Sequence, residues 1–168
     1  MNIEAKHRAL VDEAARQGRK DGQDIALCFQ ILSLADAIDR DCASRLAPWH
    51  LSESRFVLLF LLHGQPEGLS PHELAERAGV TRATITGLLD GMERDGFLRR
   101  QGDPQDRRKL RVRLTAKGCE TGAALFDGHM RWIASLLAGL GTDDRRELGR
   151  LLGMVWQNTD QATEKDRT

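Results

Sequence analysis

The chain has 168 residues, of which 40% are hydrophobic and 30% charged, so it is long and apolar enough to bury the core of a folded domain. Its 25 basic and 25 acidic residues cancel, which excludes a uniformly basic surface and leaves local charge as the way to attract a polyanion. No apolar run is long enough for a transmembrane helix, and the charged N-terminus is not typical of a secretory signal. We therefore expect a cytoplasmic protein with no membrane partner.

The cysteine and histidine patterns argue against disulfides and metals. Three scattered cysteines favour reduced thiols in a cytoplasm. No paired Cys or His spacing indicates a zinc site. We expect the five histidines on the surface or in helix caps, and we expect no cofactor.

Helical periodicity dominates the first part of the chain. A charged helix is predicted over about 3–17, within an N-terminal extension that covers 1–23. A long helix over about 24–47 follows, because apolar side chains recur there at three- and four-residue steps. Pro48 interrupts it, and a short apolar helix is predicted over 53–63 with Ser52 as its N-cap.

Two short helices joined by a tight turn come next. Ser70 and Glu73 form a predicted capping box at the start of the first helix, which Gly79 ends. Thr81 is the predicted N-cap of the second helix, which runs to Asp95.

The C-terminal part is predicted as a hairpin and two long helices. Strands over 97–101 and 109–114 flank a polar loop. A helix opened by Thr115 is expected to reach about Leu140, and Thr142 is expected to cap a last helix. The predicted fold class is therefore mainly α with a small β-wing.

The window 71–88 follows the helix-turn-helix pattern. Ala75 is small, so two helices can cross closely, and Gly79 occupies the turn, where a positive φ is needed. The apolar positions of the pattern are filled by Leu74, Ala78, Val80, Ile85 and Leu88. An ordinary helical hairpin is the alternative interpretation.

The exposed side of the second helix is a candidate DNA-reading surface. Its short side chains and single Arg let a helix approach base edges and phosphates. The alternative is a set of caps and solvated residues. The candidate residues are Thr81, Arg82, Ala83, Thr84, Thr86 and Gly87.

Positive charge gathers next to this helix. The segment 71–118 holds eleven basic and seven acidic residues, a net charge of +4 in a neutral chain. Eight of the basic residues fall between Arg99 and Lys117. A charge run is most often a solvated face, but this one directly follows the helix-turn-helix. We therefore interpret it as a phosphate-binding surface.

The segment LAERAGVTRATITGLLDGMERDGFLRR, followed by DPQDRRKLRVRLTAKG, resembles the MarR family of winged helix-turn-helix transcription regulators. The resemblance extends more loosely over 24–159. It implies a homodimer whose first and last helices interlock, with each subunit binding a half-site of near-palindromic double-stranded DNA. It divides the chain into a winged helix-turn-helix at 51–114 and a helical dimerisation region at 24–50 and 115–163. Because the C-terminus is polar, we expect a frayed tail at 164–168.

The same resemblance implies roles for individual residues. Residues 81–87 would enter the major groove. Asp106 would orient Arg108, which would enter the minor groove, where a narrow groove attracts an inserted Arg. Arg107 and Lys109 would contact phosphates or help to hold the wing. Several members have an Arg where this chain has Gly87.

The resemblance also implies a signal, either a small anionic or phenolic effector or oxidation of a cysteine. Cys28 resembles the reactive cysteine of the members that sense organic hydroperoxides. Those members support the thiolate with tyrosines, whereas this chain has no Tyr and carries Cys42 and Glu53 at two of the matching positions. Core packing of Cys28 is therefore the competing interpretation. Trp49, Trp132 and Trp156 are candidates for an effector cleft, or for core and dimer interface.

The function favoured by these observations is a DNA-binding transcription regulator, a repressor released by a small effector. One alternative is a redox-switched regulator that uses Cys28. Another is a winged helix used for protein–protein contact, against which the charge of the hairpin counts. An enzyme is not expected, because the sequence has neither a Gly-rich cofactor loop nor a nucleophile–base motif.

Overall fold

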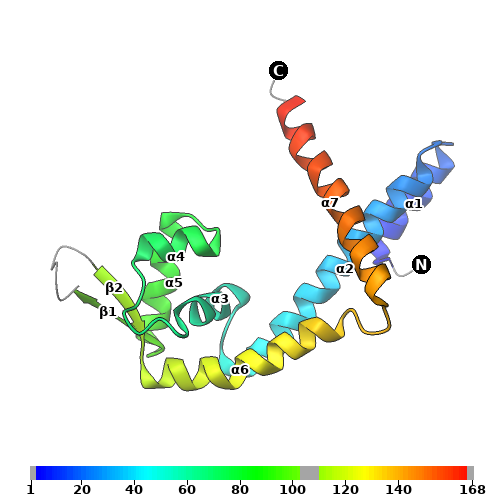
Figure 1. Cartoon of the computed structure of the whole chain (residues 1–168). Helices are drawn as coiled ribbons and strands as arrows, with labels where there is room; N and C mark the ends of the chain where they lie inside the picture. Colours follow the sequence, from blue (N-terminus) through cyan, green and yellow to red (C-terminus); the bar gives the residue numbers. More distant parts are fainter. Residues whose placement is uncertain (1–2, 103–109, 166–168) are drawn as a thin grey trace. The chain divides into compact units, whose positions relative to one another are not determined.

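The computed structural model describes residues 3–102 and 110–165, with side chains described as far as residue 159. It is mainly α-helical with one two-stranded antiparallel sheet, as the sequence predicts. The elements in chain order are α1 (Ala5–Arg16), α2 (Gly22–Leu46), the 3-10 turn η1 (Ala47–Trp49), α3 (Glu53–Leu62), α4 (Pro71–Ala78), α5 (Arg82–Arg94), β1 (Leu98–Gly102), β2 (Leu110–Leu114), α6 (Ala116–Ser135) and α7 (Thr142–Lys165) (Figure 1). The chain divides into two compact units, Met1–Gly122 and Ala123–Thr168.

The predicted N-caps at Ser52, Ser70 and Thr81 are confirmed by side-chain hydrogen bonds. The hydroxyl of Ser52 accepts a hydrogen bond from the backbone N–H of Arg55, and that of Thr81 accepts one from Thr84. Ser70 and Glu73 form the complete capping box. Each cap satisfies N–H groups that have no partner within their own helix.

The core of the winged helix joins α3, α4, α5 and the sheet. Gly79 adopts φ 65°, which lets α4 end in a left-handed turn directly before α5. The largest fully buried side chains of this core include Leu58, Leu59, Leu74, Ile85, Leu89, Met92, Leu98 and Val112. Ala75 is also buried. Of the apolar positions of the helix-turn-helix pattern, Leu74 and Ile85 are buried, and the other three are half-buried: Ala78, Val80 and Leu88.

The sheet is extended by a single bridge. β1 and β2 pair from Leu98 opposite Leu114 to Gly102 opposite Leu110. On the outer side of β2, the N–H of Leu69 donates to the carbonyl of Val112 at 3.1 Å, and the N–H of Val112 donates to the carbonyl of Leu69 at 2.8 Å. The loop before α4 thereby covers one edge of the hairpin.

Helix α1 packs along α2 through a buried polar contact. His7 is buried, its ring stacks on Phe29 with centroids 5.0 Å apart, and its Nδ1 lies 2.8 Å from Ser33 Oγ. The expectation of surface histidines is thus wrong for His7. The apolar faces of its ring are covered while a hydroxyl satisfies its polar edge.

The second unit corrects two predicted boundaries. Helix α6 ends at Ser135, five residues before the predicted Leu140, and turn hydrogen bonds such as Leu136 N–H to the carbonyl of Ile133 follow it. Helix α7 begins at Thr142, so that Thr142 is its first residue and not its cap. His129 is buried beside Trp132, which is a second exception to surface histidines.

Candidate nucleic-acid interface

The N-terminal half of α5 presents the predicted reading surface. The six candidate side chains from Thr81 to Gly87 are all exposed, whereas Ile85 between them is buried and anchors the helix. The hydroxyl of Thr86 donates to the carbonyl of Arg82 at 2.9 Å, and the hydroxyls of Thr81 and Thr84 lie 2.9 Å apart. The capping interpretation is therefore correct for Thr81, and it leaves the surface accessible. The contact of these residues with DNA stays a prediction.

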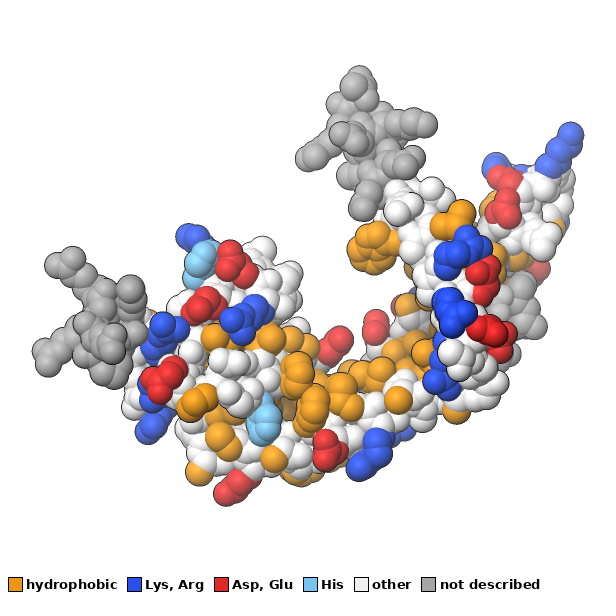
Figure 2. Space-filling view, viewed as in Figure 1, with side chains coloured by type: hydrophobic (Ala, Val, Ile, Leu, Met, Phe, Trp, Pro, Cys, Tyr) orange, Lys and Arg blue, Asp and Glu red, His pale blue; other side chains and the backbone are white. Residues whose placement is uncertain are grey.

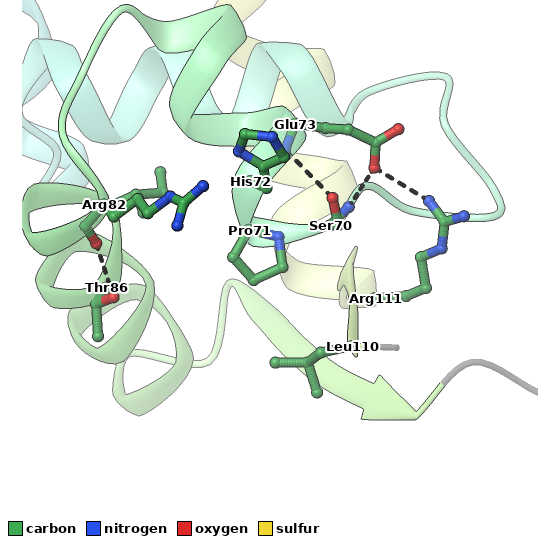
Figure 3. A pocket seen from close by; sticks show the side chains of 9 residues that line it. Ser70, Pro71, His72, Glu73, Arg82, Thr86, Leu110 and Arg111 are labelled. Atoms are coloured by element: carbon green, nitrogen blue, oxygen red, sulfur yellow. Dashed lines mark hydrogen bonds and ion pairs between the residues drawn. The ribbon is translucent and has the colours of Figure 1, made fainter. Parts of the chain in front are cut away.

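A cavity of about 690 Å³ lies beside this surface, between the start of α4, α5 and β2 (Figure 3). Its lining residues are Ser70, Pro71, His72, Glu73, Arg82, Ile85, Thr86, Leu110 and Arg111. Glu73 Oε2 accepts hydrogen bonds from the backbone of Ser70 at 2.8 Å and from Arg111 Nη1 at 3.2 Å. The hydrogen bonds from Ser70, with a smaller contribution from Arg111, lower the pKa of Glu73. Glu73 therefore joins the start of α4 to β2 as a carboxylate.

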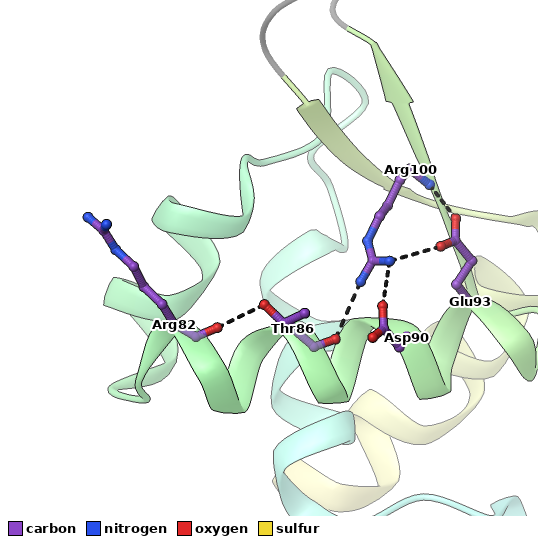
Figure 4. A network of polar contacts seen from close by, with 5 residues as sticks. All are labelled: Arg82, Thr86, Asp90, Glu93 and Arg100. Carbon is purple, nitrogen blue, oxygen red and sulfur yellow. Dashed lines mark hydrogen bonds and ion pairs between the residues drawn. The ribbon is translucent and has the colours of Figure 1, made fainter.

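The basic residues at the base of the wing are largely held by carboxylates. Arg100 Nη1 lies 2.6 Å from Asp90 and 3.2 Å from Glu93 (Figure 4). Arg113 Nη2 lies 2.9 Å from Glu67, and Arg111 is paired with Glu73. The local charge excess is present, but part of it serves the fold. This pairing could not be read from a count of charges.

The four candidate residues at the tip of the wing are Asp106, Arg107, Arg108 and Lys109. They lie outside the described residues. Their roles stay predictions.

A second set of contacts between elements, which the sequence did not predict, holds the C-terminal end of α5. Arg55 Nη1 of α3 donates to Asp95 Oδ2 at 2.8 Å, and Lys117 Nζ of α6 donates to the carbonyl of Asp95 at 2.8 Å. Lys117 also lies 4.4 Å from the centre of the Phe97 ring. Gly91 provides room for Arg55, because a Cβ there would lie 2.4 Å from Arg55 Nη2. A glycine inside a helix was the available signal for this close approach.

The cysteines and tryptophans divide by exposure. Cys28 is exposed, so the expectation that it packs in a core is wrong within one chain, and its redox role stays a prediction. Cys42 is buried, and burial, followed by the charge of Glu53, raises the pKa of its thiol. Trp132 is buried, whereas Trp49 and Trp156 are exposed.

The described residues contain neither a candidate membrane span nor a candidate metal-binding cluster. Among the helices of residues 3–102 and 110–165, none combines the length and apolar character of a membrane span. In the same part of the chain, no group of three or more His, Cys, Asp and Glu residues is placed to hold a metal ion.

A helix-turn-helix packed on a two-stranded hairpin defines the winged helix class of DNA-binding domains. Residues 51–110 match the model of the MarR family. Two curated relatives are named as HTH-type transcription regulators. The HTH-type transcriptional repressor YetL of Bacillus subtilis is 29% identical over 153 residues, which cover 90% of this chain and 92% of YetL. The HTH-type transcriptional regulator TtmR of Methylorubrum extorquens is 36% identical over 106 residues, covering 62% of this chain and 54% of TtmR.

Solved structures share the fold. The S. aureus MepR–DNA complex superposes with a TM-score of 0.69 at 19% identity, covering 78% of this chain and 96% of that one. The transcriptional regulator PA4135 gives a TM-score of 0.60 at 26% identity, with 78% and 96% covered. Residues 51–110 thus match the MarR family, and the chain resembles HTH-type transcription regulators over most of its length.

Proposed function

We propose that the chain binds double-stranded operator DNA in a sequence-specific manner as a homodimer and represses transcription. The observation that carries this proposal is the exposed N-terminal half of α5. Arg82 occupies the first position of this helix, where the helix dipole disfavours a cation, and the first turn holds no acidic residue to offset it. A departure from local rules at an exposed position is expected where a site binds a partner. Phosphate groups are the partner that suits Arg82. Repression is proposed because YetL carries that name.

Salt dependence of DNA binding tests the proposal. The full-length chain should select a near-palindrome with half-sites roughly 10 bp apart from random DNA. Its affinity should fall steeply with salt as phosphate contacts release counterions. Arg82→Ala should weaken binding by on the order of 1–3 kcal/mol and reduce the salt slope by about 1.

A matched control is available on the same helix. Arg94 is exposed at the other end of α5, and Arg94→Ala should change the affinity much less. Wild-type binding that is weak and insensitive to salt would instead support a protein–protein interaction module.

Dimerisation is supported by apolar side chains that a single chain leaves exposed (Figure 2). In the second unit, Trp156 is 71% exposed. Other exposed apolar residues there are Ile133, Leu136, Leu137, Leu140, Leu151, Leu152, Met154 and Val155. Leu27, Leu32 and Leu34 of α2 are exposed in the first unit. Surfaces of this kind are expected to bury against a second copy.

Light scattering tests this assembly. At micromolar concentration the mass should be about twice the 18.8 kDa of one chain. Trp156→Asp should shift the mass toward one chain, while Asn158→Asp, an exposed change on the same helix, should not. A wild-type mass of one chain would contradict the proposal.

A small anionic or phenolic effector is proposed to bind in the cavity beside Trp49. This cavity of about 740 Å³ is lined by Pro48, Trp49, His50, Asp95, Phe97, Lys117 and Thr121. Trp49, which is 40% exposed, offers an aromatic face, and Lys117 offers positive charge. Benzoate and phenol are suitable probes of the two ligand classes. Binding of either should raise the melting temperature of the wild type, and Trp49→Ala should reduce that rise. Equal shifts in the two proteins would place the effector elsewhere.

A further inference from the structure

Arg100 connects the wing to α5 by three kinds of contact (Figure 4). Its guanidinium donates to Asp90 and Glu93, at 2.6 and 3.2 Å. Its Nη2 lies 3.4 Å from the carbonyl of Thr86, and its backbone N–H donates to Glu93 Oε1 at 2.8 Å. One residue of β1 is therefore tied to two side chains and one carbonyl of α5. The Arg100 side chain is 22% exposed.

The hydrogen bond from the Arg100 backbone N–H to Glu93 stabilises the edge of a two-stranded sheet. Such a sheet is marginally stable by itself, and its outward N–H groups lack a strand partner. Arg100 pairs across the sheet with Val112, whose own outward groups bond to Leu69. Glu93 occupies the corresponding place on the β1 side. The hairpin is thus attached at both edges, and its attachment to α5 runs through Arg100 and Glu93.

We propose that Arg100 and Glu93 form a clamp that positions the wing relative to α5, so that both reach one DNA duplex in a fixed geometry. This inference rests on the DNA binding proposed above. Arg100 acts here as a positioning residue, because its guanidinium is already paired with two carboxylates, Asp90 and Glu93. From the number of basic residues alone, Arg100 would have been assigned to phosphate binding, and the clamp gives it a structural role instead.

The clamp and simple electrostatics predict opposite effects for Glu93. Removing an acidic residue near DNA should strengthen binding if only charge matters. If Glu93 holds the wing, Glu93→Gln should weaken binding, because the amide cannot form the charged pair with Arg100. We expect binding about tenfold weaker, the size of one charge-assisted hydrogen bond, with the salt slope of the wild type retained.

Arg100→Lys separates positioning from phosphate contact. A lysine keeps the charge and can serve a phosphate as a point charge, but it cannot bridge Asp90, Glu93 and Thr86 as the planar guanidinium does. A positioning role predicts that Arg100→Lys binds DNA about as weakly as Glu93→Gln does. The double variant should bind only slightly more weakly than either single variant. Two matched controls are Arg94→Lys, at an exposed residue at the C-terminal end of α5, and Glu76→Gln, at an exposed acidic residue of α4. Both should bind as the wild type does.

The experiment uses the full chain, a duplex selected by the wild type, a salt series, and amide hydrogen exchange of the free protein. Tighter binding by Glu93→Gln, or wild-type affinity in Arg100→Lys, would overturn the clamp. A wild type that binds no duplex would instead overturn the proposed function. Hydrogen exchange then tests the clamp by itself: the Arg100 amide should exchange faster in Glu93→Ala than in the wild type. Unchanged exchange would refute the contact in the free protein.

Discussion

The reading half of α5 and the base of the wing lie side by side but are built in opposite ways. From Thr81 to Gly87 the candidate side chains are short, exposed and, apart from Arg82, uncharged. At the wing base the side chains are long and charged, and Arg100, Arg111 and Arg113 are each paired with a carboxylate. The first region is accessible to a partner, while the second is held in place by its own contacts.

This difference shows that a basic residue near the proposed DNA-binding surface need not be available to a phosphate. A guanidinium already paired with carboxylates must lose those contacts before it can serve a phosphate. Arg82, which stands alone in charge at the start of its helix, carries no such cost. The positions of the carboxylates therefore decide which basic side chains stabilise the fold and which stay available to a phosphate.

The largest effect is expected at the attachment of the wing, in Gly68→Ala. Gly68 has φ +70°, and a Cβ there would lie 2.3 Å from the carbonyl oxygen of Val112. The strained backbone and the clash with the Leu69–Val112 bridge together should destabilise the chain by on the order of 2–4 kcal/mol. Urea denaturation measures this loss.

Gly64→Ala is the matched control for that change. Gly64 has a similar φ of +74°, but no atom lies within 4 Å of the added Cβ. Its cost should be limited to the backbone strain, on the order of 1 kcal/mol. Equal losses in the two variants would mean that the Val112 carbonyl moves aside at no cost in stability.

A smaller loss of stability is expected at the candidate DNA-reading surface, in Thr81→Ala. The hydroxyl of Thr81 accepts the N–H of Thr84 at 3.1 Å, and loss of such a cap costs about 1 kcal/mol. Thr86→Ala is the control, because Thr86 is inside the helix and its hydroxyl caps nothing. It should leave stability within about 0.5 kcal/mol of the wild type. Similar losses at both positions, measured by urea denaturation, would count against the cap.

The sequence predicted what depends on local chemistry. The caps at Ser52, Ser70 and Thr81 and the left-handed Gly79 were predictable because each is determined by residues within about four positions. The end of α6 at Ser135 was not, because no Gly or Pro marks it. The pairs of Arg100 with Asp90 and of Arg55 with Asp95 depend on the packing of separate elements. The buried His7 likewise depends on α1 lying against α2.

Two glycines of α5 are expected to differ in how much their replacement by alanine stabilises the chain. Gly87 lies on the reading surface, and no atom lies within 4 Å of a Cβ added there. Gly87→Ala should stabilise the chain by about 0.5–1 kcal/mol, because Gly is a poor helix former. Gly91→Ala has the same helical benefit but meets Arg55 Nη2 at 2.4 Å, so its gain should be reduced or lost. Melting temperatures of the two variants check this, and an equal gain would show that Arg55 moves aside at no cost.

The smallest effect concerns Glu73, which joins α4 to the wing, and it depends on pH. Hydrogen bonds from Ser70 lower the pKa of Glu73 below its ordinary value of 4.5. A carboxyl whose pKa is lowered by folding stabilises the chain above its unfolded pKa, and this contribution is lost as the pH falls through the folded value. Because the Glu73 side chain is 40% exposed, the contribution should stay below about 1 kcal/mol.

Glu73→Gln should therefore be less stable than the wild type at pH 7, and the difference should shrink in acid, as the pH falls below 4.5 and the Glu73 carboxylate of the wild type takes up its proton. Urea denaturation across this pH range measures the difference. Glu76→Gln, at an exposed residue of the same helix, should show a smaller difference at every pH. A difference between Glu73→Gln and the wild type that is constant with pH, or that grows in acid, would mean that the charge of Glu73 does not stabilise the joint with Arg111. The capping box would then act through hydrogen bonds alone, and the wing base would be held by its remaining ion pairs.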